Sequence, residues 1–277
     1  MDIDYIVADP TGNITVLVRS PYSADDRDKI ISTAFELEPA CEQVGFISSV
    51  KPGHIKLEMM GYEFCGNASL SAASWQAYSD GLDRDDETMV LVDSSGISET
   101  LRVYLRRLED IRHCDSGDLY PHFTGRIMMP VPHVSTFRDH PVVHLDGISH
   151  LIVSAEEFTD AQAVSQIKGF ANDLDVPALG ILLCNIKPEN IRDLDASVEM
   201  RPLVYVRDSD TLVWEHGCAT GSTAIGYYRY FMRGINASKG ADAAGYVTDV
   251  LQPGGLISIN IKNGRPELTG HVILRKY

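Results

Sequence analysis

Two cysteines lie in the same kind of turn in the two halves of the chain. Cys65 lies in the segment Glu63–Ser69 and Cys218 in Glu215–Ser222, and in each a serine follows the cysteine by four positions. A strand-like run precedes each segment and a helical run follows it, so we expect each cysteine to open a helix. A helix N-terminus presents unpaired N–H groups and about half a positive charge, which lowers a thiol's pKa and can hold a carboxylate. Two such sites facing each other would bind one small acid.

The order of expected elements repeats in outline between the halves. Asp9–Asn13 is a turn between two short β-type runs, which predicts a hairpin over Ile3–Arg19. Helical spacing predicts helices over Ser23–Phe35, Cys65–Tyr78, Ala161–Leu174 and Thr223–Met232, with strands between them. We therefore predict an α+β protein of two similar lobes whose cysteines meet at a cleft. Pro130-Val131-Pro132 marks the boundary, giving an N-terminal lobe over residues 1–129 and a C-terminal lobe over 130–263.

Composition excludes several classes of partner. The chain carries 24 Lys and Arg against 39 Asp and Glu, a formal net charge of −15, which disfavours nucleic acid and anionic membrane surfaces. No apolar run reaches the length of a membrane span, and the N-terminus lacks the basic and apolar regions of a signal peptide, so we expect a cytoplasmic protein.

The five cysteines do not form a disulfide framework, because their number is odd and they are scattered. Cys41, Cys114 and Cys184 lack the helix-start context and are interpreted as packing or incidental thiols. His140 and His144 straddle Pro141 in a strand-like run, where two rings cannot share a helical face, so no metal site is expected.

Several strings in the chain resemble a known family. Gly61–Ala73, His216–Gly226, Asp146–His150, the Gly12-Asn13 turn and the Pro253-Gly254-Gly255 turn are similar to the diaminopimelate epimerase superfamily of cofactor-independent amino-acid racemases, over nearly the whole chain. Gly12–Thr15, Cys41–Ile47, Glu63–Ala68 and Gln252–Gly255 resemble more closely the histidine racemases of staphylopine-type metallophore pathways.

The resemblance implies two pseudo-symmetric lobes, each an antiparallel barrel-like sheet around a central helix. It also implies that the C-terminal strand, residues 264–277, returns to the first lobe. It implies an isomerase without a cofactor or metal, acting on a small-molecule amino acid, and homodimers are common in the family.

The mechanism can be argued from chemistry as well. Inversion at an α-carbon needs a base on one face and an acid on the other, and the developing charge on the carboxylate side must be stabilised. Cys65 as thiolate and Cys218 as thiol, or the reverse for the other enantiomer, meet the first demand. The alternative reading of each is a small buried hydrophobe. Gly66-Asn67 and Ala219-Thr220 supply N–H groups for the carboxylate, unless they only form tight turns.

Other candidate residues are carried over from the family position by position. His150 matches a histidine that poises one of the thiols, and Glu215 matches a glutamate that poises a base and binds the substrate's ammonium group. The alternative for Glu215 is a solvated carboxylate at a strand end. Asn13 and Gln43 match amides of the substrate pocket, although Asn13 is also a good turn former. Glu42 could meet a basic side chain or simply lie outside.

Departures from the family pattern bear on the substrate. Diaminopimelate epimerases carry an arginine directly after the glutamate, where this chain has His216, and an Arg-Cys pair where this chain has Leu70 and Ser71. A distal carboxylate would lack its bidentate partner. We therefore expect interconversion of L- and D-histidine for metallophore synthesis, with Glu42, Gln43 and His216 as candidate partners of an imidazole.

Three alternatives remain open at this point. The chain could be a diaminopimelate epimerase or racemize another amino acid. It could catalyse an isomerization of the phenazine-pathway type, although those relatives lack the cysteine pair. It could also be a non-catalytic thiol switch or ligand-binding protein in which Cys65 and Cys218 form a disulfide.

Overall fold

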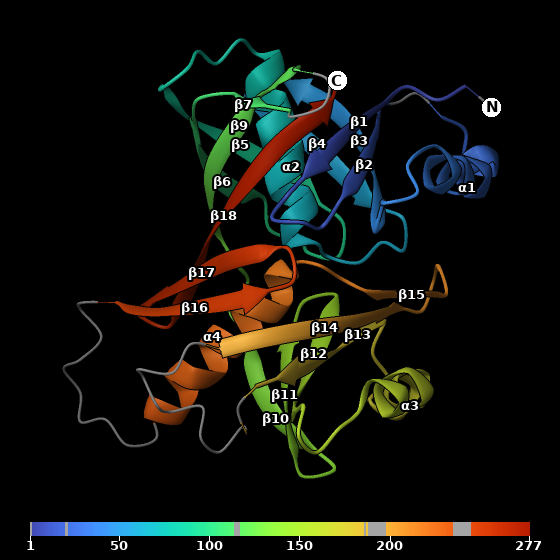
Figure 1. Ribbon diagram of the computed structural model, residues 1–277, viewed down its shortest axis with the longest axis vertical. Helices are drawn as coiled ribbons and strands as arrows, with labels where there is room; N and C mark the ends of the chain where they lie inside the picture. Colours follow the sequence, from blue (N-terminus) through green and yellow to red (C-terminus); the bar gives the residue numbers. More distant parts are fainter. Residues whose placement is uncertain (1, 20–21, 114–116, 186, 188–197, 235–244) are drawn as a thin grey trace. The chain divides into compact units, whose positions relative to one another are not determined.

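The computed structural model describes residues 2–19, 22–113, 117–185, 187, 198–234 and 245–277, and Cys114 lies outside them. The chain divides into two compact units (Figure 1). Unit 1 comprises Met1–Ile127 and Gly270–Tyr277, and unit 2 comprises Met128–Thr269. Among the described residues, no helix is both long and apolar enough to cross a bilayer.

Unit 1 is built on a closed barrel. Among the described residues, eight strands follow one another in the order β1-β2-β3-β4-β5-β6-β9-β18, and β18 pairs back with β1. The strands are β1 (Tyr5–Asp9), β2 (Thr15–Arg19), β3 (Gln43–Lys51), β4 (His54–Met59), β5 (Glu87–Ser94), β6 (Leu101–Arg107), β9 (His122–Met128) and β18 (Arg265–Lys276). A separate pair, β7 (Ile111–Arg112) and β8 (Leu119–Tyr120), forms a small two-stranded sheet.

The helix α2 (Gly66–Ser79) fills this barrel. It contacts β2, β3, β4, β5 and β6, and Figure 1 shows it lying among these strands. Many of its residues are small, with Ala68, Ala72 and Ala73 fully buried, so the strands can approach the helix from several sides. The first residue of α2 follows Cys65, and the barrel therefore fixes where that thiol lies.

The sheets are mixed, which corrects the expectation of antiparallel barrels. In unit 1, β2 pairs with β3 and β4 with β5 in parallel. The physical reason is that a helix intervenes in each case: α1 (Arg27–Leu37), preceded by the 3-10 turn Ala24–Asp26, joins β2 to β3, and α2 joins β4 to β5. A helical crossover returns the chain to the end at which the previous strand began, so the next strand runs parallel to it.

Unit 2 uses the same kind of connection. Its strands follow the order β10-β11-β12-β13-β14-β16-β17-β18, with β15 paired to β14. β12 and β13 are parallel across α3 (Asp160–Asp173), and β14 and β16 are parallel around α4 (Ala219–Gly234). The strands are β10 (His133–Phe137), β11 (His140–Leu145), β12 (Ile148–Ser154), β13 (Ala178–Cys184), β14 (Val198–Val206), β15 (Thr211–Trp214), β16 (Tyr246–Gln252) and β17 (Gly255–Lys262).

Helix α4 packs against strands of this sheet, and α3 covers another part of it. α4 contacts β16, β17, β11 and β12, whereas α3 contacts β13 and β14. Around α3 the core includes Phe158, Ile167 and Phe170. Each cysteine-bearing turn thus leads into a helix that is packed against the sheet of its own unit.

Candidate active site

Cys65 is the N-cap of α2, as the sequence predicts. Its backbone is extended, at φ −131° and ψ 113°, and its sulfur accepts a hydrogen bond from the Ala68 N–H at 3.4 Å. The Ser69 hydroxyl donates to the Cys65 carbonyl oxygen at 2.8 Å. The thiol is half-buried at the start of the helix.

Cys218 has the same local geometry at the start of α4. Its sulfur accepts from the Gly221 N–H at 3.4 Å, and the Ser222 hydroxyl donates to its carbonyl oxygen at 2.9 Å. In both turns the sulfur therefore meets an N–H three residues ahead, and a serine four residues ahead anchors the cysteine carbonyl. The similarity of the two strings corresponds to a shared pattern of hydrogen bonds.

Buried polar side chains of unit 1 surround Cys65. The Cys65 thiol donates to Gln43 Oε1 at 3.0 Å, and Gln43 Nε2 donates both to Asn13 Oδ1 and, at 2.8 Å, to Thr15 Oγ1. Asn13 Nδ2 donates to Glu42 Oε2 at 2.8 Å. Asn13, Glu42, Gln43 and Cys65 thus form one connected network, joined by Thr15, which sequence reasoning missed.

The loop before Cys65 is held by a neighbouring turn. Gly96 lies so close to this loop, with φ +77°, that a Cβ there would be 2.3 Å from the Phe64 backbone nitrogen. The Ser95 hydroxyl donates to the Glu63 carbonyl oxygen at 2.9 Å. Only glycine fits at position 96, and the backbone that presents Cys65 is fixed by this contact.

Cys218 is more deeply buried than Cys65. Burial raises the pKa of the Cys218 thiol well above its usual value, and the negative charge of the Glu215 carboxylate raises it further. The Thr220 hydroxyl, 3.5 Å from the sulfur, and the Gly221 N–H act in the opposite direction. A Cys218 thiolate therefore requires a group that takes its proton, and Glu215 is adjacent.

His150 contacts this cluster through Thr220. His150 lies on β12, is fully buried, and its Nε2 is 2.9 Å from Thr220 Oγ1. Burial lowers the pKa of His150 to about 3, so the ring is neutral near pH 7. Space for the ring exists because Gly180, its partner on β13, has no side chain: a Cβ there would lie 2.2 Å from His150 Nδ1.

Gln252 supports Cys218 from the end of β16. Its Oε1 accepts from the Cys218 N–H at 2.6 Å, and its Nε2 donates to the Ser222 hydroxyl oxygen at 2.9 Å. The next turn is tied to the same region, because the Gly254 N–H donates to the His216 carbonyl oxygen at 2.7 Å. Gln252 opens the Gln252–Gly255 string that resembles the histidine racemases, but it was not among the candidate site residues.

The predicted site residues thus form two groups. Asn13, Glu42, Gln43, Cys65, Gly66 and Asn67 belong to unit 1, and all except Cys65 are buried. His150, Glu215, His216, Cys218, Ala219 and Thr220 belong to unit 2. Within that group His216 is exposed and Glu215 is half-buried, whereas the other four are buried.

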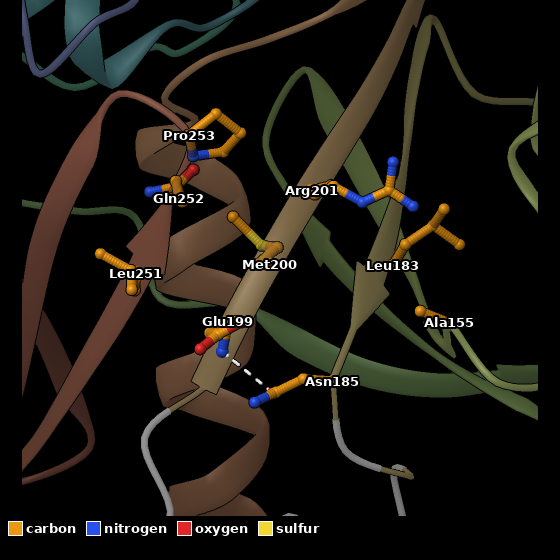
Figure 2. Close-up of a pocket in the computed structure, with 9 residues that line it drawn as sticks. All are labelled: Ala155, Leu183, Asn185, Glu199, Met200, Arg201, Leu251, Gln252 and Pro253. Atoms are coloured by element: carbon orange, nitrogen blue, oxygen red, sulfur yellow. Dashed lines mark hydrogen bonds between the residues drawn. The ribbon is translucent and has the colours of Figure 1, made fainter.

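A cavity of about 370 Å³ lies beside the second group. Figure 2 shows Gln252 and Pro253 at one end of its lining, with Asn185 and Glu199 at the other. Arg201, which also lines it, is paired to both carboxylate oxygens of Asp160, at 2.6 and 2.8 Å. None of the site residues predicted from the sequence lines this cavity, but Gln252 in its lining is hydrogen-bonded to Cys218.

The other cysteines of the described residues have no such setting. Cys41 and Cys184 are buried, and burial raises the pKa of Cys41 to about 11 and that of Cys184 to about 12. Among the described residues, no group of three or more His, Cys, Asp or Glu side chains is arranged to hold a metal ion.

Comparison with known proteins gives a consistent result. The family model described as "Histidine racemase CntK N-terminal domain" matches residues 2–274. A histidine racemase of Fusobacterium nucleatum is 31% identical over 98% of this chain and 94% of its own length. A histidine racemase of Staphylococcus aureus is 26% identical, covering 94% of this chain and 89% of its own.

Solved structures show the same fold. A predicted epimerase from Pseudomonas aeruginosa superposes with a TM-score of 0.65 at 14% identity, covering 99% of this chain and 97% of its own. A hydroxyproline epimerase from Agrobacterium vitis, solved with bound trans-4-hydroxy-L-proline, has a TM-score of 0.55 at 11% identity, covering 99% and 88%.

Proposed function

Because the chain belongs to the histidine racemase CntK N-terminal domain family, and is thus an amino-acid racemase, we propose that its own substrate is histidine, interconverted between the L and D forms. The observation that carries the proposal is the match to histidine racemases over nearly the whole chain. The local geometry shared by Cys65 and Cys218 supports it.

The proposed reaction uses the two thiols on opposite faces of the α-carbon. One sulfur, as thiolate, removes the α-proton, and the other, as thiol, gives its proton to the opposite face, so the first sulfur ends protonated and the second ends as thiolate. In the reverse direction the roles exchange. A thiol pair accomplishes this inversion without pyridoxal phosphate.

The starts of α2 and α4 are proposed to stabilise the negative charge that develops on the carboxylate. First-turn N–H groups and the helix dipole favour an anion there, at Gly66-Asn67 and at Ala219-Thr220. In unit 2, Glu215 is proposed as the acceptor of the Cys218 proton, because its carboxylate adjoins that thiol. The Thr220 hydroxyl is proposed to stabilise the resulting thiolate.

The proposal includes two pseudo-symmetric lobes. Their boundaries lie at residues 129 and 263, and the last strand returns to the first lobe. The parallel crossover helices of both units support it, since a cysteine precedes one helix in each unit. We also propose a cytoplasmic enzyme, possible as a homodimer, that supplies D-histidine for opine metallophore synthesis.

Histidine is preferred to diaminopimelate because of the groups available. His216 stands where an arginine would bind a distal carboxylate, and the buried amides of Asn13 and Gln43 offer hydrogen bonds to a neutral polar substrate. Glu42 Oε2 accepts from Asn13 Nδ2, which links this carboxylate to the Asn13 amide.

The test is α-proton exchange by NMR in D₂O under reducing conditions. Exchange and inversion with L-histidine, and none with diaminopimelate or a panel of other L-amino acids, would support the proposal. Cys65→Ser and Cys218→Ser should each abolish inversion, whereas Cys184→Ser, which changes a buried thiol of β13, should retain it. Exchange with diaminopimelate and none with histidine would overturn the substrate assignment.

A non-catalytic thiol switch, the alternative of another class, is set aside because the chain matches a histidine racemase family over residues 2–274.

A further inference from the structure

The hydrogen bonds of the polar network in unit 1 have a fixed order of donors and acceptors. Four buried or half-buried side chains follow one another as Glu42, Asn13, Gln43 and Cys65, with Asn13 wholly buried and Gln43 only 4% exposed. Each link is a hydrogen bond of normal donor and acceptor type, and the last one joins Gln43 Oε1 to the Cys65 sulfur at 3.0 Å.

The direction is set at Glu42. An ionised carboxylate only accepts hydrogen bonds, so Asn13 must present its NH₂ group to Glu42 and its Oδ1 to Gln43. Gln43 must then turn its own NH₂ group toward Asn13, which leaves Oε1 for Cys65. Reversing any one amide would place two donors or two acceptors against each other.

Thr15 reinforces the same direction. Its hydroxyl donates to the Asn13 carbonyl oxygen at 3.0 Å, so its lone pairs are available to accept from Gln43 Nε2 at 2.8 Å. Both donors of the Gln43 amide are thereby used, and the amide does not have a free N–H to offer the sulfur. The Gln43 atom that faces Cys65 is therefore an acceptor.

An acceptor facing a sulfur favours S–H over S⁻, because the thiol donates to it while the thiolate meets a second centre of negative charge. We infer that Glu42 is a positioning residue: acting through Asn13 and Gln43, it keeps Cys65 protonated in the substrate-free enzyme, so that Cys65 is the resting proton donor. This inference rests on the proposed racemase function. In the first turnover the other sulfur, as thiolate, takes the α-proton as the C–H bond breaks. The S–H bond of Cys65 then breaks as its proton bonds to the α-carbon, and the Cys65 sulfur keeps the electron pair of that bond.

Two other ionisable groups of unit 1 are close to this network in sequence or by hydrogen bond. The Glu63 carboxylate lies on the same loop, where its Oε2 accepts from the Gly61 N–H at 3.0 Å. The Cys41 thiol donates to the Gln43 carbonyl oxygen at 3.0 Å, and burial holds its pKa at about 11. A test must therefore separate two effects on Cys65: the order of donors and acceptors in the network, and the negative charge of Glu42.

The experiment is alkylation by iodoacetamide as a function of pH, followed by mass spectrometry of the peptide that contains Cys65. The Glu42→Gln side chain keeps the shape of the original but can donate a hydrogen bond as well as accept one. The amides of Asn13 and Gln43 can then reverse, and Gln43 can present its NH₂ group to a Cys65 thiolate. The pH of half-maximal reaction should fall by about one unit. Glu42→Met removes the same charge without a donor and should shift the midpoint by clearly less.

Asn13→Ala provides a second, independent variant. It leaves the Glu42 carboxylate in place and interrupts the network, which frees Gln43 to turn toward Cys65. The midpoint should again fall, although no charge has been removed. Circular dichroism and thermal melting establish that each variant compared is folded, and either Glu42→Gln or Asn13→Ala suffices for the comparison.

The inference is overturned if Glu42→Gln and Glu42→Met shift the midpoint equally, or if the folded Asn13→Ala protein does not shift it. Alkylation does not depend on turnover, so it distinguishes this failure from failure of the proposed function. A protein that shows the shifts but exchanges no α-proton with histidine would retain the directed network and lose the racemase assignment.

Discussion

His150 and Thr220 are joined by a contact of 2.9 Å between Nε2 and Oγ1. His150 Nδ1 has no hydrogen-bond partner among the described residues. A buried N–H without a partner is rarer than an under-satisfied acceptor, so the proton of the neutral ring belongs on Nε2. His150 then donates to Thr220, and the Thr220 hydroxyl is free to donate to the Cys218 sulfur. In this arrangement the buried histidine is linked to the Cys218 thiol through the Thr220 hydroxyl.

Stability should fall in acid because of His150. Its folded pKa of about 3 lies below the unfolded value near 6.5, so below pH 6.5 the unfolded chain binds the extra proton first. The stabilisation is complete above pH 6.5 and is lost as pH falls toward 3, at about 1 kcal/mol per pH unit. Urea unfolding between pH 7 and 5 measures this slope.

His150→Gln should flatten that slope, since glutamine can donate to Thr220 but does not titrate. His216→Gln is the matched control, because His216 is exposed. An unchanged slope in His150→Gln would show that other groups cause the acid sensitivity.

Gly180→Ala should destabilise the protein, since the added Cβ would lie 2.2 Å from His150 Nδ1 in a packed interior. We expect a loss of about 1–3 kcal/mol in the free energy of unfolding. Gly169→Ala is the control: this glycine lies in α3 with no atom within 4 Å of an added Cβ, and alanine there should be neutral or stabilising by up to about 1 kcal/mol. Equal effects of the two changes would contradict the contact.

The sequence predicted the helices better than the strand directions. The helix expected over Cys65–Tyr78 is observed as Gly66–Ser79, and the hairpin predicted from the Asp9–Asn13 turn is observed as the antiparallel pair β1–β2. Runs of small residues and turn-forming residues are local features of the sequence, and they are sufficient to predict these two elements. Whether two strands run parallel depends on the helix between them, and this was misjudged at β2–β3.

For the candidate site, the sequence motifs indicate which residues start the two helices. They do not indicate which side chains support those residues. Gln252 contacts Cys218 across 34 positions, and Gly180 matters only because His150 lies on the neighbouring strand. Such contacts come from the register of distant strands, which a single sequence does not encode locally. The β10 strand, His133–Phe137, was also missed; it pairs with β11, and Phe137 packs against Phe170 of α3.

Thr220→Val should disfavour the thiolate form of Cys218. Removing the hydroxyl removes an influence that lowers the pKa of Cys218, so the pKa should rise further and alkylation of Cys218 should require higher pH. α-Proton exchange should slow by about tenfold or more, the scale of one hydrogen bond to a charged group. Thr223→Val is the control, because that hydroxyl donates at 2.9 Å to the Ala219 carbonyl oxygen within the same helix. Equal rates in the two variants would contradict the role of Thr220.

Gln252→Met should lower the free energy of unfolding by about 1–3 kcal/mol, because the buried Cys218 N–H loses its acceptor. Ser222→Ala removes the other partner of the same side chain. The double variant should be less destabilised than the sum of the two single variants, since one hydrogen bond is lost in both. Additive values from urea unfolding would indicate that the two groups are independent.

The course of β18 has a consequence for how the protein is made. Its residues up to Thr269 pair with β17 in unit 2, and the following residues pair with β1 in unit 1, so that Val7 lies opposite Lys276. On the ribosome, the segment that closes the first barrel is therefore synthesised after all of unit 2. Until β18 is made, β1 and β9 remain unpaired on the sides that β18 later covers.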